Sequence, residues 1–135
     1  MSKGFLLDTN IISNLVRQPG GNASRMLHEN ANAYCCTSII AACELRFGAE
    51  KAASEALRDR INQVLERLDI LPLDAPVDLY YGRIRAALES KETPIGPNDL
   101  LIAAHALALD LTLVTDNTAE FSRVESLRVE NWLRS

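Results

Sequence analysis

Four acidic residues stand at positions from which their side chains can reach one another. Asp8 and Asp116 each follow an apolar run of the kind that forms a buried strand. Glu44 lies among small and apolar residues, where a lone glutamate needs a partner, and Asp99 opens a strongly apolar stretch. Four carboxylates within a few ångström repel one another and destabilise a fold unless cations neutralise them. The sequence therefore predicts a cation site.

The types of ligand indicate which cation this is. Sites made only of carboxylate oxygens suit Mg²⁺ or Mn²⁺, whereas zinc favours histidine and thiolate ligands. His28, in a polar loop-like stretch, and His105, in the apolar stretch, fit no ligand spacing, and we expect structural or surface roles for both. Cys35, Cys36 and Cys43 form neither an even set nor a metal motif, so we expect reduced thiols.

Three of the four acids also have a structural explanation of their own. Asp8 is a suitable N-cap for a helix that begins at the next residue, and Asp99 would favour a helix N-terminus electrostatically. Asp116 is suited to an Asx turn, as is Asn117 beside it. Glu44 is harder to explain alone. One shared site therefore accounts for the four acids better than four unrelated roles do.

The elements that must position the acids alternate between strands and helices. Four strands are expected, at Phe5–Leu7, Ala33–Thr37, Ile70–Leu73 (at a sheet edge because of its proline) and Leu111–Thr115. Helices are expected over Thr9–Arg17, around Ser24–Asn30, after a cap at Ser38, over Ser54–Leu68, over Val77–Leu88 after a cap at Asp74, and over Asn98–Leu109, with a loop at Ser90–Pro97. This alternation implies an α/β fold with a parallel sheet, whose ligands bind beyond the carboxyl ends of the strands.

Length and composition set the class of protein. The 135 residues fit a single domain over 1–135, and 47% hydrophobic with 24% charged residues is ordinary for a globular protein. No apolar run approaches the roughly 20 residues that span a membrane, and Asp8 interrupts the N-terminal run, unlike a signal peptide. We expect a soluble, cytoplasmic protein. The net charge of −4 lacks the basic excess typical of nucleic-acid binders.

Four ordered segments carry these acids and their surroundings. They read LLDTNIISNLV (6–16), TSIIAACELRFG (37–48), GPNDLLIAAHALALDLTLVTDN (96–117) and EFSRVESLRVENW (120–132). Together they resemble the PIN-domain ribonucleases and, within them, the VapC-like toxins of bacterial toxin–antitoxin pairs. The resemblance runs essentially end to end, and four segments at the expected spacing are far more specific than DTN alone.

The resemblance implies a three-layer α/β/α sandwich with a central parallel sheet and an acidic pocket for Mg²⁺ or Mn²⁺. By position, the family's acids fall on Asp8, Glu44, Asp99 and Asp116. Close relatives can have asparagine at the last position, so Glu120 is expected to share or replace the role of Asp116. Hydrogen bonds to these acids are expected from Thr9, Asn10, Ser38 and Thr115.

The implied activity is metal-dependent cleavage of structured RNA, commonly tRNA, by an activated water that leaves a 3′-hydroxyl and a 5′-phosphate. An RNA path to the acids is expected from basic residues despite the negative net charge: Arg17, Arg25, Arg46, Lys51, Arg83, Arg85 and Arg123. The resemblance also implies a VapB-like antitoxin that places a basic residue in the pocket, and a homodimer or a hetero-oligomer with that antitoxin.

Two other functions are consistent with part of the sequence. A phosphatase of the haloacid-dehalogenase kind also has an aspartate after its first strand, but it usually has a second acid two residues later, where this chain has Asn10. The second alternative is a catalytically silent PIN-like module that binds RNA or a partner. The four intact acids favour the nuclease over both.

Overall fold

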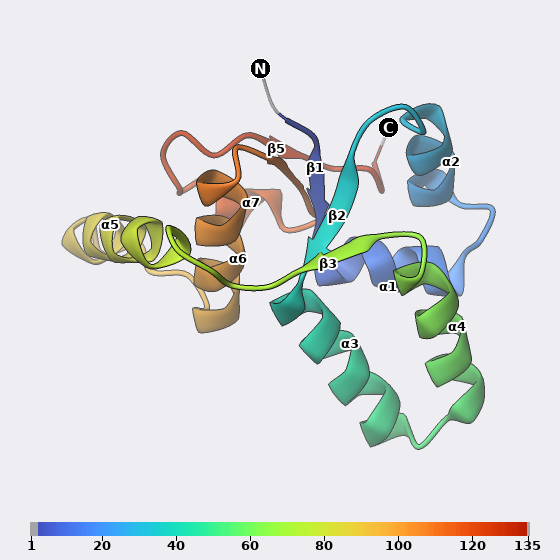
Figure 1. Ribbon diagram of the computed structural model, residues 1–135. Helices are drawn as coiled ribbons and strands as arrows, with labels where there is room; N and C mark the ends of the chain where they lie inside the picture. The colour runs from blue at the N-terminus through green and yellow to red at the C-terminus, as the bar shows by residue number, and fades with distance from the viewer. Residues whose placement is uncertain (1–2, 135) are drawn as a thin grey trace.

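A sheet of five parallel strands forms the centre of the computed structural model, which describes residues 3–134 (Figure 1). The strands lie in the order β3-β2-β1-β4-β5. Their bounds are β1 (Phe5–Leu7), β2 (Cys35–Ser38), β3 (Asp69–Leu71), β4 (Thr112–Val114) and β5 (Val129–Glu130). The four expected strands are present, β1 with the predicted ends and the other three with ends that differ by one or two residues, and β3 is an edge strand as predicted.

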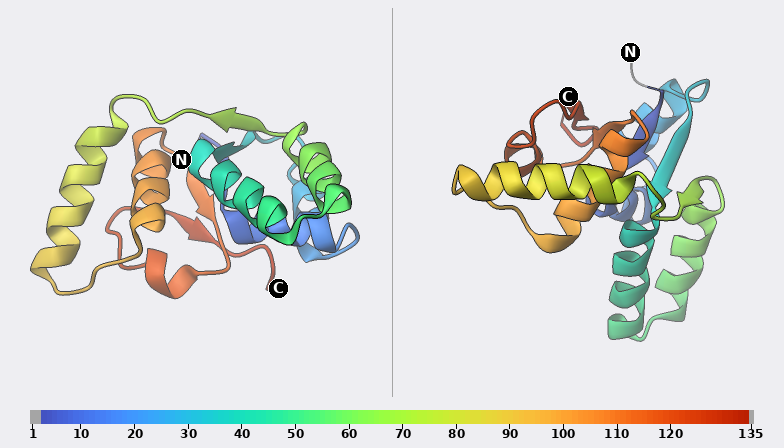
Figure 2. Two further views of the ribbon diagram at one scale, coloured as in Figure 1. Left: turned by 90° about the horizontal axis from the view of Figure 1, so that it is seen from below. Right: turned by 60° about the vertical axis from the view of Figure 1, so that its left-hand side comes forward.

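Seven helices cover the two faces of this sheet within the described residues. They are α1 (Thr9–Arg17), α2 (Asn22–Glu29), α3 (Ile39–Ala52), α4 (Glu55–Leu65), α5 (Val77–Ser90), α6 (Pro97–Ala108) and α7 (Thr118–Phe121). Figures 1 and 2 show α1 to α4 on one side of the sheet and α5 to α7 on the other, with α3 and α4 extending beyond it as a hairpin. The predicted three-layer α/β/α fold is confirmed.

The alternation of side chains along the buried strands divides the core between the two layers. Leu6 and Leu113 are fully buried against α5 and α6, whereas Leu7 and Val114 are fully buried against α1, α3 and α4. Strands buried on both faces read as continuous apolar runs, which is why β1 and β4 were evident in the sequence.

The chain reverses its direction of travel across the sheet at β1. From β1 it passes outward to β2 and β3, and it then returns through α5 and α6 to β4 and β5 on the other side of β1. Ligands of such sheets bind at this switch point, beyond the carboxyl ends of the two central strands. Residues 8 and 115 occupy that position, one after β1 and the other after β4.

Of the N-caps predicted at Ser38 and Asp74, the structure contains the first and not the second. The Ser38 hydroxyl accepts the Ile40 N–H at 3.1 Å and caps α3, as expected. The predicted cap from Asp74 is wrong: Pro76 occupies the N-cap position of α5, and only the Asp74 backbone carbonyl takes part, accepting the Val77 N–H at 2.9 Å.

Several other expectations differ in detail. The helix expected to end at Leu68 ends at Leu65, and α6 begins at Pro97 because proline fits the first position of a helix, where no N–H is needed. His28 lies in α2 and not in a loop. The short α7 and β5 were not predicted. Among the helices of residues 3–134, none combines the length and the apolarity that a membrane crossing requires.

Candidate active site

Asp8 occupies the switch point and is 97% buried, with only 3% of its surface exposed. Its Oδ1 accepts the Thr9 N–H at 2.8 Å, so it caps α1, and its Oδ2 accepts the Thr115 hydroxyl at 2.8 Å and the Asn10 amide at 3.3 Å. Burial raises the pKa of Asp8, and the nearby Glu44 charge adds to this rise, while the hydrogen bonds from Thr115 and Thr9 oppose it. The carboxyl group is thus both a helix cap and a member of an acidic cluster.

Glu44 joins this cluster from α3. The Thr9 hydroxyl donates to Glu44 Oε1 at 2.6 Å, which links the first turn of α1 to the second turn of α3. The buried neighbours Ala41, Ala42 and Leu45 hold this part of α3 against the sheet. The predicted need of Glu44 for a polar partner is therefore met by Thr9.

Asp99 lies in the first turn of α6 and donates its carboxyl proton to Glu120 of α7 in a side-chain hydrogen bond. Burial raises the pKa of Asp99 to about 7, and the negative charges of Asp8, Glu120 and Glu44 contribute to the rise. A carboxyl group whose pKa is this high holds a proton near neutral pH because the surrounding acids disfavour another negative charge. The contributions of Asp8, Glu44 and Glu120 to this rise indicate that the four acids lie near one another.

Glu120 is fixed by three donors. The Gly96 N–H donates to its Oε1 at 2.8 Å, and the Asn117 amide donates to its Oε2 at 2.6 Å. Burial alone would raise the pKa of Glu120, but these hydrogen bonds, the one from Asp99 and the nearby Arg123 charge together lower it. A Cβ atom at Gly96 would lie 3.7 Å from Asp99 Oδ2 and 3.8 Å from Glu120 Oε1, so both carboxyl groups flank this backbone position.

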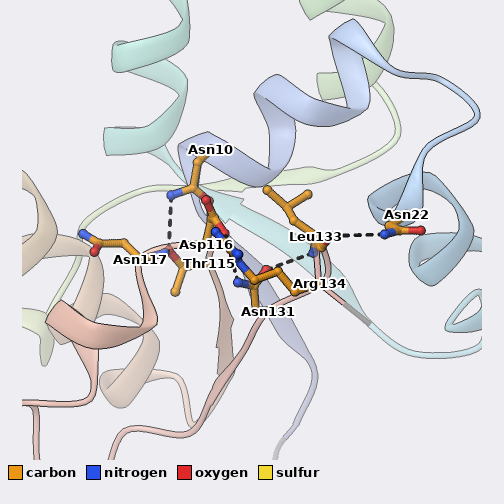
Figure 3. Close-up of polar contacts among 8 residues, drawn as sticks. All are labelled: Asn10, Asn22, Thr115, Asp116, Asn117, Asn131, Leu133 and Arg134. Carbon is orange, nitrogen blue, oxygen red and sulfur yellow. Dashed lines mark hydrogen bonds and ion pairs between the residues drawn. The ribbon is translucent and has the colours of Figure 1, made fainter.

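The side chain of Asp116 binds the C-terminal segment (Figure 3). Its Oδ1 accepts the Asn131 amide at 3.0 Å and the Arg134 guanidinium at 3.2 Å. The bond from Asn131 lowers the pKa of Asp116, slight burial opposes this, and Arg134 lowers the pKa further. Of the two residues expected to share the fourth position, the structure brings Glu120 to the cluster and does not bring the Asp116 side chain there.

A polar network ties the ends of β1 and β4 together. Asn10 donates to Thr115 Oγ1 at 3.3 Å and accepts the Asp116 N–H through its Oδ1 at 2.9 Å (Figure 3). Thr115 Oγ1 also accepts the Asn117 N–H at 3.0 Å. The hydrogen bonds predicted from Thr9, Asn10 and Thr115 to the acids are thus present in the structure.

Ser38 has a different environment from the one predicted. Its hydroxyl lies 2.9 Å from His105 Nδ1 and accepts the Ile40 N–H, and none of its hydrogen bonds among the described residues reaches an acid. His105 is almost completely buried on α6, and this burial lowers its pKa, although the nearby Asp74 charge and a hydrogen bond with the Pro72 backbone work in the other direction. The expected structural role of His105 agrees with this packing.

The acidic cluster has little compensating charge. Within residues 3–134, no ion pair involves Asp8, Glu44, Asp99 or Glu120, although Arg123 is near enough to lower the pKa of Glu120. In the same part of the chain, no three His, Cys, Asp or Glu side chains stand close enough together to enclose a metal ion. The ligand chemistry nevertheless suits a hard divalent cation, because the cluster offers only oxygen ligands and an excess of negative charge.

The seven basic residues expected along an RNA path do not form one surface. Arg83 and Arg123 line a hollow beside α5, and Arg17 lines another hollow that contains Glu44. Arg25 and Arg46 are bonded to asparagine side chains. These basic residues therefore have different surroundings in the structure, which the sequence did not indicate.

Sequence reasoning did not identify Gly96, Asn117, Asn131 and Arg134. Asn117 carried a signal, because an asparagine beside Asp116 was noted as a turn residue, but its side chain instead holds Glu120. The roles of Asn131 and Arg134 depend on where the C-terminal segment packs, which no local pattern indicated.

Comparison with known proteins identifies the family of the chain. The PIN domain family matches residues 5–127. Ribonuclease VapC2 of Rickettsia felis is 40% identical over 132 residues, which cover 95% of this chain and 97% of that protein. The tRNA(fMet)-specific endonuclease VapC of Salmonella typhimurium is 36% identical over 129 residues, with 95% and 97% covered.

A solved structure shows the same arrangement of elements. The crystal structure of VapBC2 from Rickettsia felis bound to a DNA fragment from their promoter matches with a TM-score of 0.88 and 37% identity, covering 95% of this chain and 98% of that chain. Sequence and structure thus agree over nearly the whole length of these relatives. The chain therefore belongs to the PIN-domain family and, within it, to the VapC ribonucleases of VapBC toxin–antitoxin pairs.

Proposed function

We propose that this VapC ribonuclease cleaves tRNA with the help of Mg²⁺ or Mn²⁺ held by Asp8, Glu44, Asp99 and Glu120. The observation that carries the proposal is the pKa of Asp99, which the other three acids help to raise to about 7. One of the four carboxyl groups therefore retains a proton near neutral pH. This means that nearby cationic side chains do not neutralise the negative charge of the cluster. A divalent cation is the simplest species that relieves this repulsion.

A divalent cation held by these carboxylates would compete with the proton of Asp99. It would supply a water of lowered pKa and offset charge on a phosphodiester. The protein's own part is to hold the carboxylates: Thr9 orients Glu44, Thr115 orients Asp8, and Asn117 orients Glu120. We propose that the nucleophile is a water molecule, so that the products carry a 3′-hydroxyl and a 5′-phosphate.

The choice of tRNA is supported by the name of the Salmonella relative, a tRNA(fMet)-specific endonuclease that matches almost end to end. A tRNA is negatively charged and needs cationic contacts, since phosphate contacts dominate the affinity of proteins for nucleic acids. The arginines near the acids supply such contacts, and the bound cation adds positive charge. We propose that the protein acts in the cytoplasm, where tRNA is found.

An antitoxin is the proposed regulator, and the solved VapBC2 complex supports it. A hollow of about 240 Å³ lies among α1, α3 and α4 and includes Thr9, Arg17 and Glu44 in its lining. We propose that a segment of a VapB-like antitoxin lies here with a basic side chain beside Glu44, and so blocks the acids. A homodimer is also proposed, and the exposed Phe47 and Leu79 are the first side chains to test in its interface.

The test is to incubate the purified, antitoxin-free protein with total bacterial tRNA, in Mg²⁺ and in EDTA, beside Asp99→Asn, and to map the fragment ends. Discrete cuts that disappear in EDTA and in Asp99→Asn are expected. If the protein binds Mn²⁺ but cuts no tRNA, the metal site stands and the substrate is wrong. If it neither binds Mn²⁺ nor cuts RNA, the protein is a silent binding module and the proposal is wrong.

A further inference from the structure

A hollow of about 290 Å³ lies between α5 and the turn that follows α7, and the proposed chemistry does not use it. Its floor is apolar, with the buried side chains of Ile84, Leu88 and Val124. Its walls carry Tyr80, Arg83, Lys91 and Arg123, and we call this site the basic cavity. Glu125 is the acidic residue among its lining residues.

The charge of the basic cavity is opposite to that of the chain. Three cations face one anion there, whereas the whole chain has a net charge of −4. Arg83, Lys91 and Arg123 are all exposed, and none of them forms an ion pair within residues 3–134. Unpaired cations gathered over an apolar floor favour an anionic ligand that also has an apolar part.

An aromatic ring adds a second type of contact. The guanidinium carbon of Arg83 lies 5.8 Å from the centre of the Tyr80 ring, which is a cation–π arrangement. Aromatic rings beside cations are the means by which proteins bind single-stranded nucleic acids, because bases stack on the ring while the cations contact phosphates. The volume of the cavity, about 290 Å³, lies just below the range of about 300–1,000 Å³ found for small-molecule sites, so the cavity has room for no more than one nucleotide.

The basic cavity is directly connected to the acidic cluster through Arg123. This residue is near enough to Glu120 to lower its pKa, and its backbone N–H donates to the Glu120 carbonyl at 3.2 Å. Its guanidinium donates to the Pro94 carbonyl at 3.0 Å. Pro94 belongs to the loop that leads to Gly96, whose N–H holds the Glu120 side chain. An RNA strand that leaves the acids on this side therefore meets Arg123 first.

The other candidate arginines are less suitable. Arg85 lies on another face of α5 and is paired with Glu89 at 2.8 Å, while Arg25 donates to Asn22 at 2.9 Å. Arg46 is also hydrogen-bonded, to Asn62. Arg85 also donates to the Tyr81 hydroxyl at 3.0 Å, so two neighbours on its own helix already hold its guanidinium. None of these three arginines lines the basic cavity.

We propose that the basic cavity binds one nucleotide of the RNA substrate next to the cleaved bond, with its base against Tyr80 and its phosphates at Arg83, Lys91 and Arg123. This inference rests on the proposed ribonuclease function and adds a substrate subsite to it. An acidic protein segment is the competing occupant. RNA is favoured because the exposed cations lie beside an aromatic ring and next to the acids that would cut the strand.

Binding is tested in an Asp99→Asn background, which is not expected to cleave RNA. The probes are a short fluorescein-labelled oligouridine and an abasic ribose-phosphate oligomer of the same length, both followed by fluorescence anisotropy. Tyr80→Leu is expected to raise the Kd for oligouridine by about tenfold and to leave the Kd for the abasic oligomer unchanged, because only stacking is lost. Thermal unfolding of each variant verifies that it is folded.

The cations are tested by their salt dependence. Arg83→Gln and Lys91→Gln are each expected to weaken binding of both probes and to reduce the slope of log K against log salt concentration by about 0.7. Arg60→Gln is the matched control, because Arg60 is exposed on α4, on the other side of the sheet, and the change removes the same charge. In cleavage of tRNA, Lys91→Gln is expected to raise KM with little change in kcat.

Specific results would overturn the proposal. The basic cavity is not an RNA subsite if Tyr80→Leu binds both probes as tightly as the parent, or if Arg60→Gln weakens binding as much as Lys91→Gln. It is a protein-binding site instead if the variants release the antitoxin and leave RNA binding unchanged. If the wild-type protein cuts no tRNA, the substrate proposal fails separately, since the oligonucleotide measurements do not depend on cleavage.

Discussion

Asp99 donates its carboxyl proton to Glu120, and this hydrogen bond joins the first turn of α6 to α7. Two carboxyl groups that share a proton avoid the repulsion that two charges would produce at this distance. The negative charges of Asp8 and Glu44 strengthen the preference of Asp99 for the protonated form. Loss of this proton, at higher pH or on binding of a cation, therefore leaves two negative charges side by side.

The first prediction concerns stability without metal. The pKa of Asp99 is about 7 in the folded protein and 3.8 in the unfolded chain, so the folded state binds more protons between these values. Its stabilising contribution is complete below about pH 4 and is lost as the pH rises through about 7. Relative to Asp99→Asn, the wild-type protein is expected to lose about 1–2 kcal/mol of unfolding free energy over this range, after allowance for solvent screening.

Urea denaturation in EDTA at about pH 4.5 and about pH 8 measures this difference. Asp59→Asn is the control, because Asp59 is exposed on α4, away from the acids. Since the pKa of Asp8 is raised as well, Asp99→Asn is expected to reduce the pH dependence without abolishing it. Equal pH dependence in wild type and Asp99→Asn would show that Asp99 does not hold the proton.

The second prediction concerns Mn²⁺. Because a cation competes with the proton of Asp99, Mn²⁺ affinity is expected to increase as the pH rises from about 6 to about 8. At a concentration 100 times the Kd, bound Mn²⁺ stabilises the fold by about 2.7 kcal/mol, which corresponds to a rise of several degrees in Tm. Differential scanning fluorimetry at both pH values tests this. If Mn²⁺ raised the Tm of Glu120→Gln as much as that of the wild-type protein, the ion would bind at another site.

The third prediction separates two acids that are close in sequence. Glu120→Gln is expected to reduce kcat/KM for tRNA by about 100-fold or more, because it removes a carboxylate from the cluster. Asp116→Asn is expected to keep activity within a few-fold and to cost less than about 1 kcal/mol of stability, since it weakens an exposed ion pair with Arg134 and keeps an oxygen that accepts from Asn131. The reverse pattern would make Asp116 the functional acid.

The fold was largely predictable because its signals are local. Buried parallel strands read as apolar runs, and the strong periodicity from Leu57 to Leu65 predicted α4 correctly, although not its last residue. By contrast, β5 has two residues and α7 has four, which is too short for any period to appear. The strand order β3-β2-β1-β4-β5 depends on the crossovers, which no local pattern in the sequence specifies.

The site was predictable only in part. Asp8 and Asp116 follow neighbouring strands, and the sequence pattern treated them alike, but their side chains bind different partners. The Asp116 side chain is held by Asn131 and Arg134, which lie 15 and 18 residues further along the chain. The partners of the Asp116 side chain are therefore determined by tertiary contacts, which the local sequence does not indicate. A single domain over 1–135 stays a prediction.

The fourth prediction concerns the C-terminal segment that carries Asn131. Trp132 is 2% exposed, and its ring packs edge-on against Phe5 with the ring centres 5.2 Å apart. Trp132→Ala is expected to cost about 3–5 kcal/mol, because it leaves a large cavity beside β1. Trp132→Phe, which keeps an aromatic ring, is expected to lose clearly less. Urea denaturation compares the two, and a cost under about 1 kcal/mol for alanine would mean that this segment does not support the core.

The fifth prediction concerns Thr115, whose buried hydroxyl donates to Asp8 and accepts from Asn10 and Asn117. Thr115→Val keeps the shape but removes these bonds, so it is expected to cost about 1–3 kcal/mol and to lower Mn²⁺ affinity and kcat/KM by about 10–100-fold. Thr115→Ser restores the hydroxyl and is expected to recover most of both. If valine destabilises the fold but leaves Mn²⁺ affinity unchanged, Thr115 stabilises the sheet without orienting Asp8.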